Sequence, residues 1–167
     1  LDMMKLPRTD IIAITMPGFG TTGRTKNNAI NLCRALGVTL KEIPITGLAE
    51  EVFKAIGHDQ SDTSLVFENT QAWARKFIEL AQASKFKGLV LGTGDLSELM
   101  LGWCTYMGDH GSHYGLNAGV PKTLISFLIG WTAEVIFAKE PAVQKILRDI
   151  LATPISPLPI TAYCSDQ

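Results

Sequence analysis

The chain has 167 residues, enough for one domain with a sizeable hydrophobic core. Its net charge of −1 provides no basic surface for nucleic acid or for an acidic membrane. Its three cysteines (Cys33, Cys104 and Cys164) fit neither a disulfide framework nor a zinc site, which favours reducing, cytoplasmic surroundings. No signal-peptide core is visible, and the most apolar stretch, residues 124–138, is too short to span a bilayer.

The hydrophobic pattern predicts strands that alternate with helices. Short β-branched or apolar runs predict strands, and apolar residues at helical spacing predict helices. The expected strands are residues 10–17, 38–45 and 88–91, and the expected helices are 24–36, 48–56, 68–84, a short one after the third strand, 122–138 and 141–151. This order predicts an α/β domain over residues 1–167 with a parallel sheet flanked by helices. Because the chain begins with Leu1 and ends abruptly, we interpret it as a piece of a longer protein.

The expected helix at residues 122–138 has too few polar positions for an ordinary surface helix. It is therefore either a core helix or part of a subunit interface.

Residues 87–122 contain most of the side chains that could perform chemistry. An apolar strand leads into a glycine turn that opens a helix, which places backbone N–H groups and a positive helix end beside a ligand. Lys122 opens the next helix, where a cation is unfavourable unless it meets an anion. The pattern predicts a site for an anionic, phosphorylated ligand. Asp95 and Glu98 also have the spacing of a helix capping box.

Other patterns have competing interpretations. Gly18, Gly20 and Gly23 spell a dinucleotide fingerprint with Glu42 further on, which would indicate a nicotinamide-dependent oxidoreductase. We disfavour it because Glu42 is expected in the middle of the second strand rather than at its end. A metal trio of Asp109, His110 and His113 is disfavoured as well, because no fourth ligand is near in the sequence. Cys104 is expected to be packed.

The run GTGDLSELMLGWCTYMGDHGSHYGLNAGVPKTL closely resembles NAD synthetases, specifically the synthetase domain of the glutamine-dependent kind. The segments TMPGFGTTGRTKNNAINLCRALG and TPISP resemble the same family. The resemblance implies a truncated Rossmann-like fold of the adenine-nucleotide hydrolase type, with three αβα layers. It implies ATP-dependent amidation of deamido-NAD to NAD through an acyl adenylate, with Mg²⁺ as cofactor, ammonia drawn from glutamine, and a homodimer formed through the synthetase domain.

The resemblance also assigns roles to individual residues. Asp109 would face the nicotinate end of the substrate and position ammonia. Glu98 would bind Mg²⁺. The implied ATP contacts are Thr15, Met16, Thr93, Lys122 and Ser156. Asn69 and Arg75 match the segment that binds the dinucleotide substrate, whereas Trp73 stands where the family has an arginine and cannot supply its bidentate donor.

Two parts of the family pattern have no match in this sequence: the S-G-G-x-D-S pyrophosphate loop and the glutaminase domain. We therefore expect the fragment alone to be inactive. Three alternatives stay open at this point: the oxidoreductase, a non-catalytic adenine-nucleotide-binding or dimerisation module, and another ligase of the ATP pyrophosphatase type.

Overall fold

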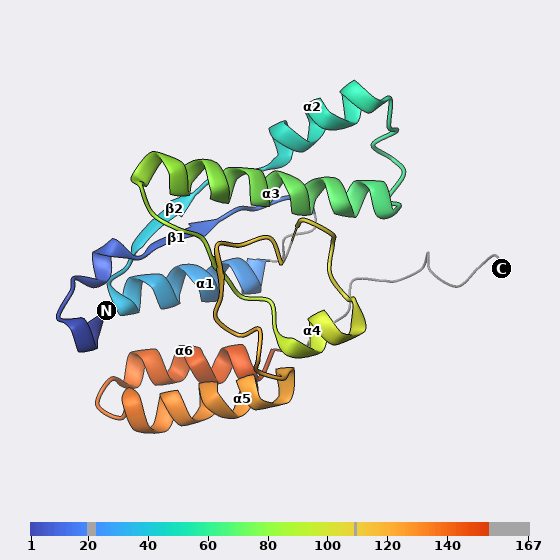
Figure 1. The fold of residues 1–167 in the computed structure, drawn as a ribbon. Coiled ribbons are helices and arrows are strands. Elements are labelled where there is room, and N and C mark those ends of the chain that lie inside the picture. Colours follow the sequence, from blue (N-terminus) through green and yellow to red (C-terminus); the bar gives the residue numbers. More distant parts are fainter. Residues whose placement is uncertain (20–22, 109, 154–167) are drawn as a thin grey trace.

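A computed structural model describes residues 1–19, 23–108 and 110–153, and Figure 1 shows their course. Strands β1 (Ile12–Thr15) and β2 (Thr39–Glu42) pair in parallel, with Ile12 opposite Thr39 and Thr15 opposite Glu42. Helix α1 (Gly23–Leu36) forms the crossover between them, as parallel pairing requires. Helix α1 begins one residue before its expected start and ends where expected. Both strands lie inside their expected ranges, 10–17 and 38–45, but are shorter.

Helices cover both faces of this strand pair. In Figure 1, α2 (Thr46–Ile56) and α3 (Leu65–Phe86) lie on one side, and α1 lies on the other. Helices α5 (Lys122–Trp131) and α6 (Pro141–Leu151) pack beyond α1 as a further layer. The expected α/β class, with parallel strands flanked by helices, is confirmed.

The third expected strand, residues 88–91, differs in extent, and it does not join the sheet of β1 and β2. Strand β3 is Leu91–Gly92 and pairs in parallel with β4, Tyr114–Gly115, in a second two-stranded sheet. Val90, the residue before β3, bonds with the loop that follows the short helix α4 (Leu96–Leu101). The Val90 N–H donates to the His113 ring at 2.9 Å, and the Val90 carbonyl accepts the His113 N–H at 3.1 Å. The loop after α4 therefore occupies one edge of this strand.

The expected helix at residues 122–138 is α5 followed by a π-helical turn, Thr132–Ile136. One side of it reaches a core formed by Ala133, Val143 and Leu147, against which α1 also packs. The other side is exposed, and none of the α5 residues is buried. The core-helix interpretation therefore holds for only one side.

A second buried cluster joins α2 to α3. Phe53 has no solvent exposure and stacks on Phe67 with ring centroids 5.4 Å apart. Among the helices of the described residues, none is long and apolar enough to cross a membrane.

Candidate functional site

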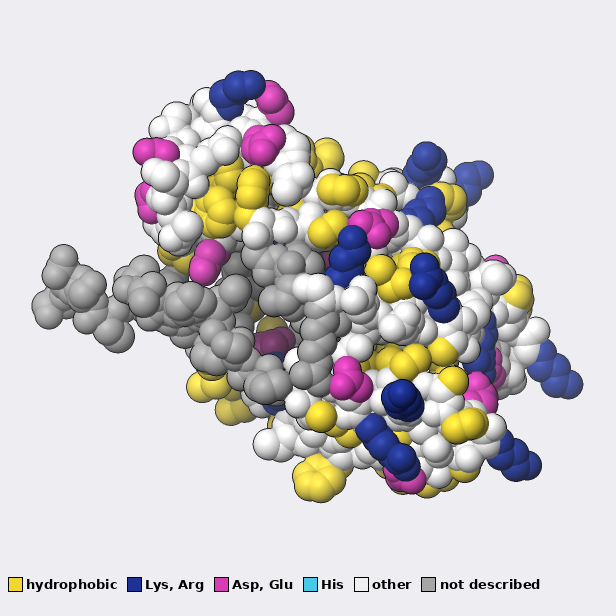
Figure 2. Space-filling model, turned by 180° about the vertical axis from the view of Figure 1, so that it is seen from behind, with side chains coloured by type: hydrophobic (Ala, Val, Ile, Leu, Met, Phe, Trp, Pro, Cys, Tyr) yellow, Lys and Arg dark blue, Asp and Glu magenta, His cyan; other side chains and the backbone are white. Residues whose placement is uncertain are grey.

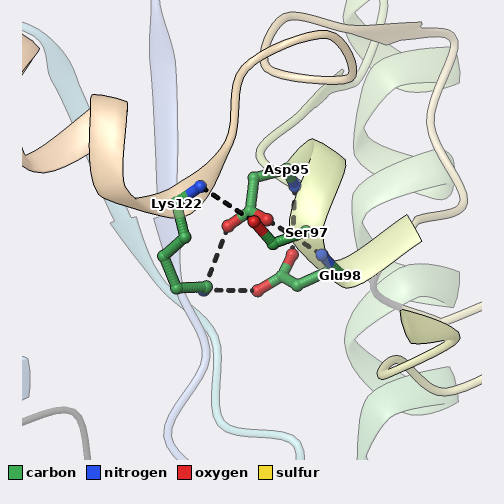
Figure 3. A network of polar contacts seen from close by, with 4 residues as sticks. All are labelled: Asp95, Ser97, Glu98 and Lys122. Atoms are coloured by element: carbon green, nitrogen blue, oxygen red, sulfur yellow. Dashed lines mark hydrogen bonds and ion pairs between the residues drawn. The ribbon is translucent and has the colours of Figure 1, made fainter. Parts of the chain in front are cut away.

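Helix α4 begins with the capping box that the sequence predicts (Figure 3). The Asp95 carboxylate accepts the Glu98 N–H at 2.9 Å, and the Glu98 carboxylate accepts the Asp95 N–H at 3.1 Å. Two of the unpaired N–H groups at the helix start are satisfied in this way. Gly92 ends β3 just before this turn, and a side chain there would collide with Ser112.

Lys122 reaches the same place from α5 (Figure 3). Its Nζ lies 3.0 Å from Asp95 Oδ2 and 2.8 Å from Glu98 Oε1. Its backbone N–H donates to Ser97 Oγ at 3.1 Å, which ties the start of α5 to the start of α4. The anionic partner expected for a lysine at a helix start is thus present within the chain. Asp95 and Ser97 are the members of this cluster that the family resemblance did not assign.

The pairing fixes the charge states of the cluster. Burial works to raise the pKa of Asp95, but hydrogen bonds from the Glu98 N–H and from Lys122 outweigh it and hold the pKa below its ordinary value. Hydrogen bonds to Glu98 and Asp95 raise the pKa of Lys122. At neutral pH the Lys122 ammonium therefore lies beside the Asp95 carboxylate at a helix N-terminus, an arrangement that can meet both phosphate oxygens and a cation.

Three of the expected ligand contacts line one cavity. Thr15, Met16 and Arg75 border a space of about 260 Å³, together with side chains of α1 and β2. Arg75 Nε donates to the Met16 carbonyl at 3.4 Å. Whole ligand sites typically measure roughly 300–1,000 Å³, so a cavity of this size suits part of a ligand such as a base.

The matching segment at residues 69–75 splits over two faces of α3, because residues four apart share a helix face. Asn69 and Trp73 face the loop after α4: Asn69 Oδ1 accepts the Thr105 hydroxyl at 2.8 Å, and Trp73 Nε1 donates to the Tyr106 carbonyl at 2.6 Å. Gln71 and Arg75 instead face the turn after β1. The indole that replaces the family arginine therefore holds the loop backbone.

Gln71 belongs to the same matching segment, although the resemblance assigned it no role of its own. It is 7% exposed, and its side-chain oxygen accepts the Phe19 N–H at 3.1 Å. A Cβ on Gly18 would lie 2.6 Å from this oxygen, so the turn after β1 requires glycine there for close approach. The four-residue spacing of Gln71 and Arg75 is the sequence signal that places both side chains on one face of α3.

The expected position of Glu42, one ground against a dehydrogenase fingerprint, is wrong. Glu42 is the last residue of β2, at the strand end, rather than in its middle. Its carboxylate pairs with Lys26 Nζ at 2.6 Å. β2 ends at Glu42, but the chain stays beside β1, because the Ile43 N–H donates to the Thr15 carbonyl at 2.9 Å and the Ile45 N–H to the Pro17 carbonyl at 3.0 Å.

The remaining candidates are Thr93, Asp109, Ser156, His110 and His113. Thr93 is exposed in the turn between β3 and α4. Asp109 and Ser156 fall outside the described residues. His110 Nδ1 lies 3.1 Å from Cys104 Sγ, and His113 binds the backbone at Val90. Over the described ranges, no group of three His, Cys, Asp or Glu side chains could hold a metal ion.

Fold and site together define an α/β protein with parallel strands flanked by helices and a charged cluster at the start of α4. The family model described as NAD synthase matches residues 1–147. The chain belongs to the NAD synthase family.

Relatives and solved structures agree with this assignment. The chain is 50% identical over 163 residues to the glutamine-dependent NAD(+) synthetase of Mycobacterium leprae, a match covering 94% of this chain but 24% of that protein. It is 31% identical over 106 residues to the NH(3)-dependent NAD(+) synthetase of Pyrobaculum aerophilum, covering 64% of this chain and 40% of the other. The chain thus spans about a quarter of the length of the glutamine-dependent relatives.

Among solved structures, the glutamine-dependent NAD+ synthetase of Acinetobacter baumannii, in complex with ADP, superposes with a TM-score of 0.72 at 26% identity, covering 80% of this chain and 26% of that one. The NH3-dependent NAD synthetase of Campylobacter jejuni gives a TM-score of 0.66 at 25% identity, covering 82% and 57%. These neighbours place the parallel strands and flanking helices in the Rossmann-like adenine-nucleotide fold.

Proposed function

We propose that this chain is part of the synthetase domain of a carbon–nitrogen ligase that converts deamido-NAD to NAD with ATP, releasing AMP and pyrophosphate. The observation that carries the proposal is the cluster of Lys122, Asp95 and Glu98 at the N-terminus of α4, in a chain of this family. The relatives do not favour the oxidoreductase or the non-catalytic module.

ATP is the proposed nucleotide. The Acinetobacter baumannii relative was solved with ADP, and this chain has a cavity lined by Thr15, Met16 and Arg75 that suits an adenine base. Thr93 would contact the triphosphate from the turn before α4. Lys122 would contact phosphate oxygens with the ammonium that the cluster holds in place. Ser156 stays a proposed phosphate contact.

Mg²⁺ fits the donor chemistry of the cluster, because carboxylate oxygens from one or two side chains, together with substrate phosphates, are its usual ligands. Glu98 is the proposed ligand, although Lys122 contacts one of its oxygens and the Asp95 N–H the other. When bound, the ion would neutralise phosphate charge.

The proposed reaction has two steps. A carboxylate oxygen of the nicotinate group attacks the α-phosphorus of ATP, and pyrophosphate leaves; ammonia nitrogen then attacks the acyl carbon, AMP leaves, and a proton is lost. Lys122 would stabilise the negative charge that develops on phosphate oxygens. Asp109 would position ammonia or accept its proton. Asn69 and Arg75 would bind the dinucleotide, and Arg75 would do so beside the cavity proposed for adenine.

The proposed partners are glutamine-derived ammonia and a second copy of the chain. The exposed side of α5 carries Phe127, Leu128 and Trp131, at 75%, 45% and 53% exposure. Figure 2, seen from the opposite direction, shows hydrophobic side chains along the lower edge of the molecule, the level of α5 and α6 in Figure 1. Such a face favours self-association in a cytoplasmic enzyme. Segments of the family outside this chain would complete the active site, so we expect the chain alone to be inactive.

The test uses the whole reading frame to which this chain belongs. Purified protein is given ATP, Mg²⁺, deamido-NAD and either glutamine or ammonia, and NAD and AMP are measured by mass spectrometry. We expect both products in equal amounts, and a fall in kcat/KM of about 10²–10³-fold for Lys122→Met, the range for loss of one electrostatic stabiliser.

Lys54→Met is the matched control, because Lys54 is also paired with a glutamate but lies on the exposed face of α2. NAD formation without AMP, or full activity of Lys122→Met, would contradict the proposal.

A further inference from the structure

Asp95 is more deeply buried than a helix cap requires. Its side chain is 3% exposed, whereas the Glu98 side chain beside it is 31% exposed. Capping alone does not call for a charge, since asparagine caps helices as well as aspartate does. A buried carboxylate is unfavourable unless it is paired. The buried charge of Asp95 therefore requires a counter-ion, and Lys122 is that counter-ion.

One carboxylate oxygen of Asp95 caps the helix and the other pairs with the lysine. Oδ1 accepts the Glu98 N–H and caps α4, while Oδ2 lies 3.0 Å from Lys122 Nζ. Lys122 arrives from α5, and without a fixed anion its four-carbon stem would sample many rotamers.

The ammonium keeps donor capacity for a ligand. It has three N–H donors, and among the described residues Asp95 and Glu98 accept two of them. The Lys122 side chain is 44% exposed, so solvent or a ligand can reach it. An anionic oxygen can therefore bind the ammonium without displacing Asp95.

We propose that Asp95 is a positioning residue that holds the Lys122 ammonium at the N-terminus of α4, with one N–H left for a phosphate oxygen of the nucleotide. The inference rests on the proposed function. It assigns the placement of Lys122 to the buried charge of Asp95. Glu98 contacts the same ammonium but is more exposed and has its own proposed role.

The decisive variant is Asp95→Asn, made in the whole reading frame. It preserves shape and helix capping but removes the charge that holds Lys122. We expect kcat/KM for ATP to fall at least tenfold, with the thermal midpoint close to that of the wild type. Asp62→Asn is the matched control, because Asp62 also accepts a backbone N–H, from Ser64, but in an exposed turn. It should leave kcat/KM unchanged.

The double variant Asp95→Asn/Lys122→Met separates positioning from a structural role. If Asp95 acts through Lys122, the double variant is no slower than Lys122→Met alone. Wild-type kinetics in Asp95→Asn, or losses that multiply in the double variant, would overturn the proposal.

A second readout needs no enzymatic activity. Brief acetylation with acetic anhydride, followed by peptide mass spectrometry, measures how available each lysine nitrogen is. We expect Lys122 to be labelled several-fold faster in Asp95→Asn than in the wild type, with Lys54 unchanged as the internal control. Equal rates at Lys122 would overturn the positioning role. A wild type that forms no NAD but shows the rate difference would refute the proposed function and support the positioning of Lys122.

Discussion

Gly18 shows how the site depends on the absence of one side chain. The residue follows β1, and the Gln71 side-chain oxygen approaches it closely while it accepts the Phe19 N–H. Arg75 lies near the same point, with Nη2 3.2 Å from where a Cβ would be. A larger residue here would displace both α3 side chains from the turn.

We predict that Gly18→Ala lowers the free energy of unfolding by about 1 kcal/mol, the typical net value of a hydrogen bond, and weakens nucleotide binding as well. Urea denaturation and ATP titration measure the two effects. Gly23→Ala is the control, because within the described part of the chain no atom beyond its chain neighbours and its own helix lies within 4 Å of its Cβ position. Equal unfolding free energies and equal ATP affinities in the two variants would contradict the close approach at Gly18.

Cys33 provides a further test at the residue scale. Burial raises the pKa of this thiol above its ordinary value, because the interior disfavours the thiolate. A raised pKa means that the folded state holds its proton more tightly, so Cys33 lowers stability only as the pH rises above the unfolded pKa.

We therefore predict that iodoacetamide modifies Cys33 in the folded chain more slowly than in urea at about pH 8.5, near the free-thiol pKa. Peptide mass spectrometry after timed labelling gives both rates. A folded rate equal to the unfolded one would contradict the effect of burial.

At the scale of elements, local signals located the helices well. Helix α6 has the bounds expected from its apolar spacing and from proline at its first turn. The capping box of α4 was readable from Asp95 and Glu98, three residues apart. Strand partners were not readable: β3 pairs with β4, within a stretch expected to be loop, because His113 and the following backbone reach Val90 from 23 residues away.

The exposed side of α5 leads to a prediction about assembly. Phe127 and Trp131 are four residues apart on one helix face, and both are more than half exposed. If this face joins two copies, Phe127→Asp buries a charge in the interface and converts the dimer to a monomer. Light scattering after gel filtration measures the mass.

Ile56→Asp on α2 is the control, since Ile56 is exposed to a similar degree, at 59%. An unchanged oligomer in Phe127→Asp, or a monomeric wild type, would refute an interface on this side of α5.

At the scale of the whole molecule, the layer of α5 and α6 supports the site from a distance. Leu147 is 8% exposed and packs with Ala133 and Val143, against which Leu32 and Leu36 of α1 also lie. Asn28 of α1 donates to Asp149 of α6 at 2.7 Å. Because Lys122 begins α5, this packing holds the helix that delivers the ammonium.

We predict that Leu147→Ala lowers the free energy of unfolding by about 2–4 kcal/mol through lost burial and a residual cavity. Leu151→Ala, one turn later and 39% exposed, should lose less than half as much. Urea denaturation of both variants gives the comparison. Equal losses would show that Leu147 does not occupy a tighter core than Leu151.

The sequence by itself determined the family, the alternation of strands and helices, and the helix cap at Asp95, because these depend on residue type and short spacing. Only the tertiary structure decided that Lys122 meets Asp95 and Glu98, that Arg75 shares a cavity with Thr15 and Met16 while Asn69 faces another loop, and that β3 pairs with β4. These contacts join segments more than 20 residues apart. They form only when chain closure and packing bring the elements together, so no short-range pattern encodes them.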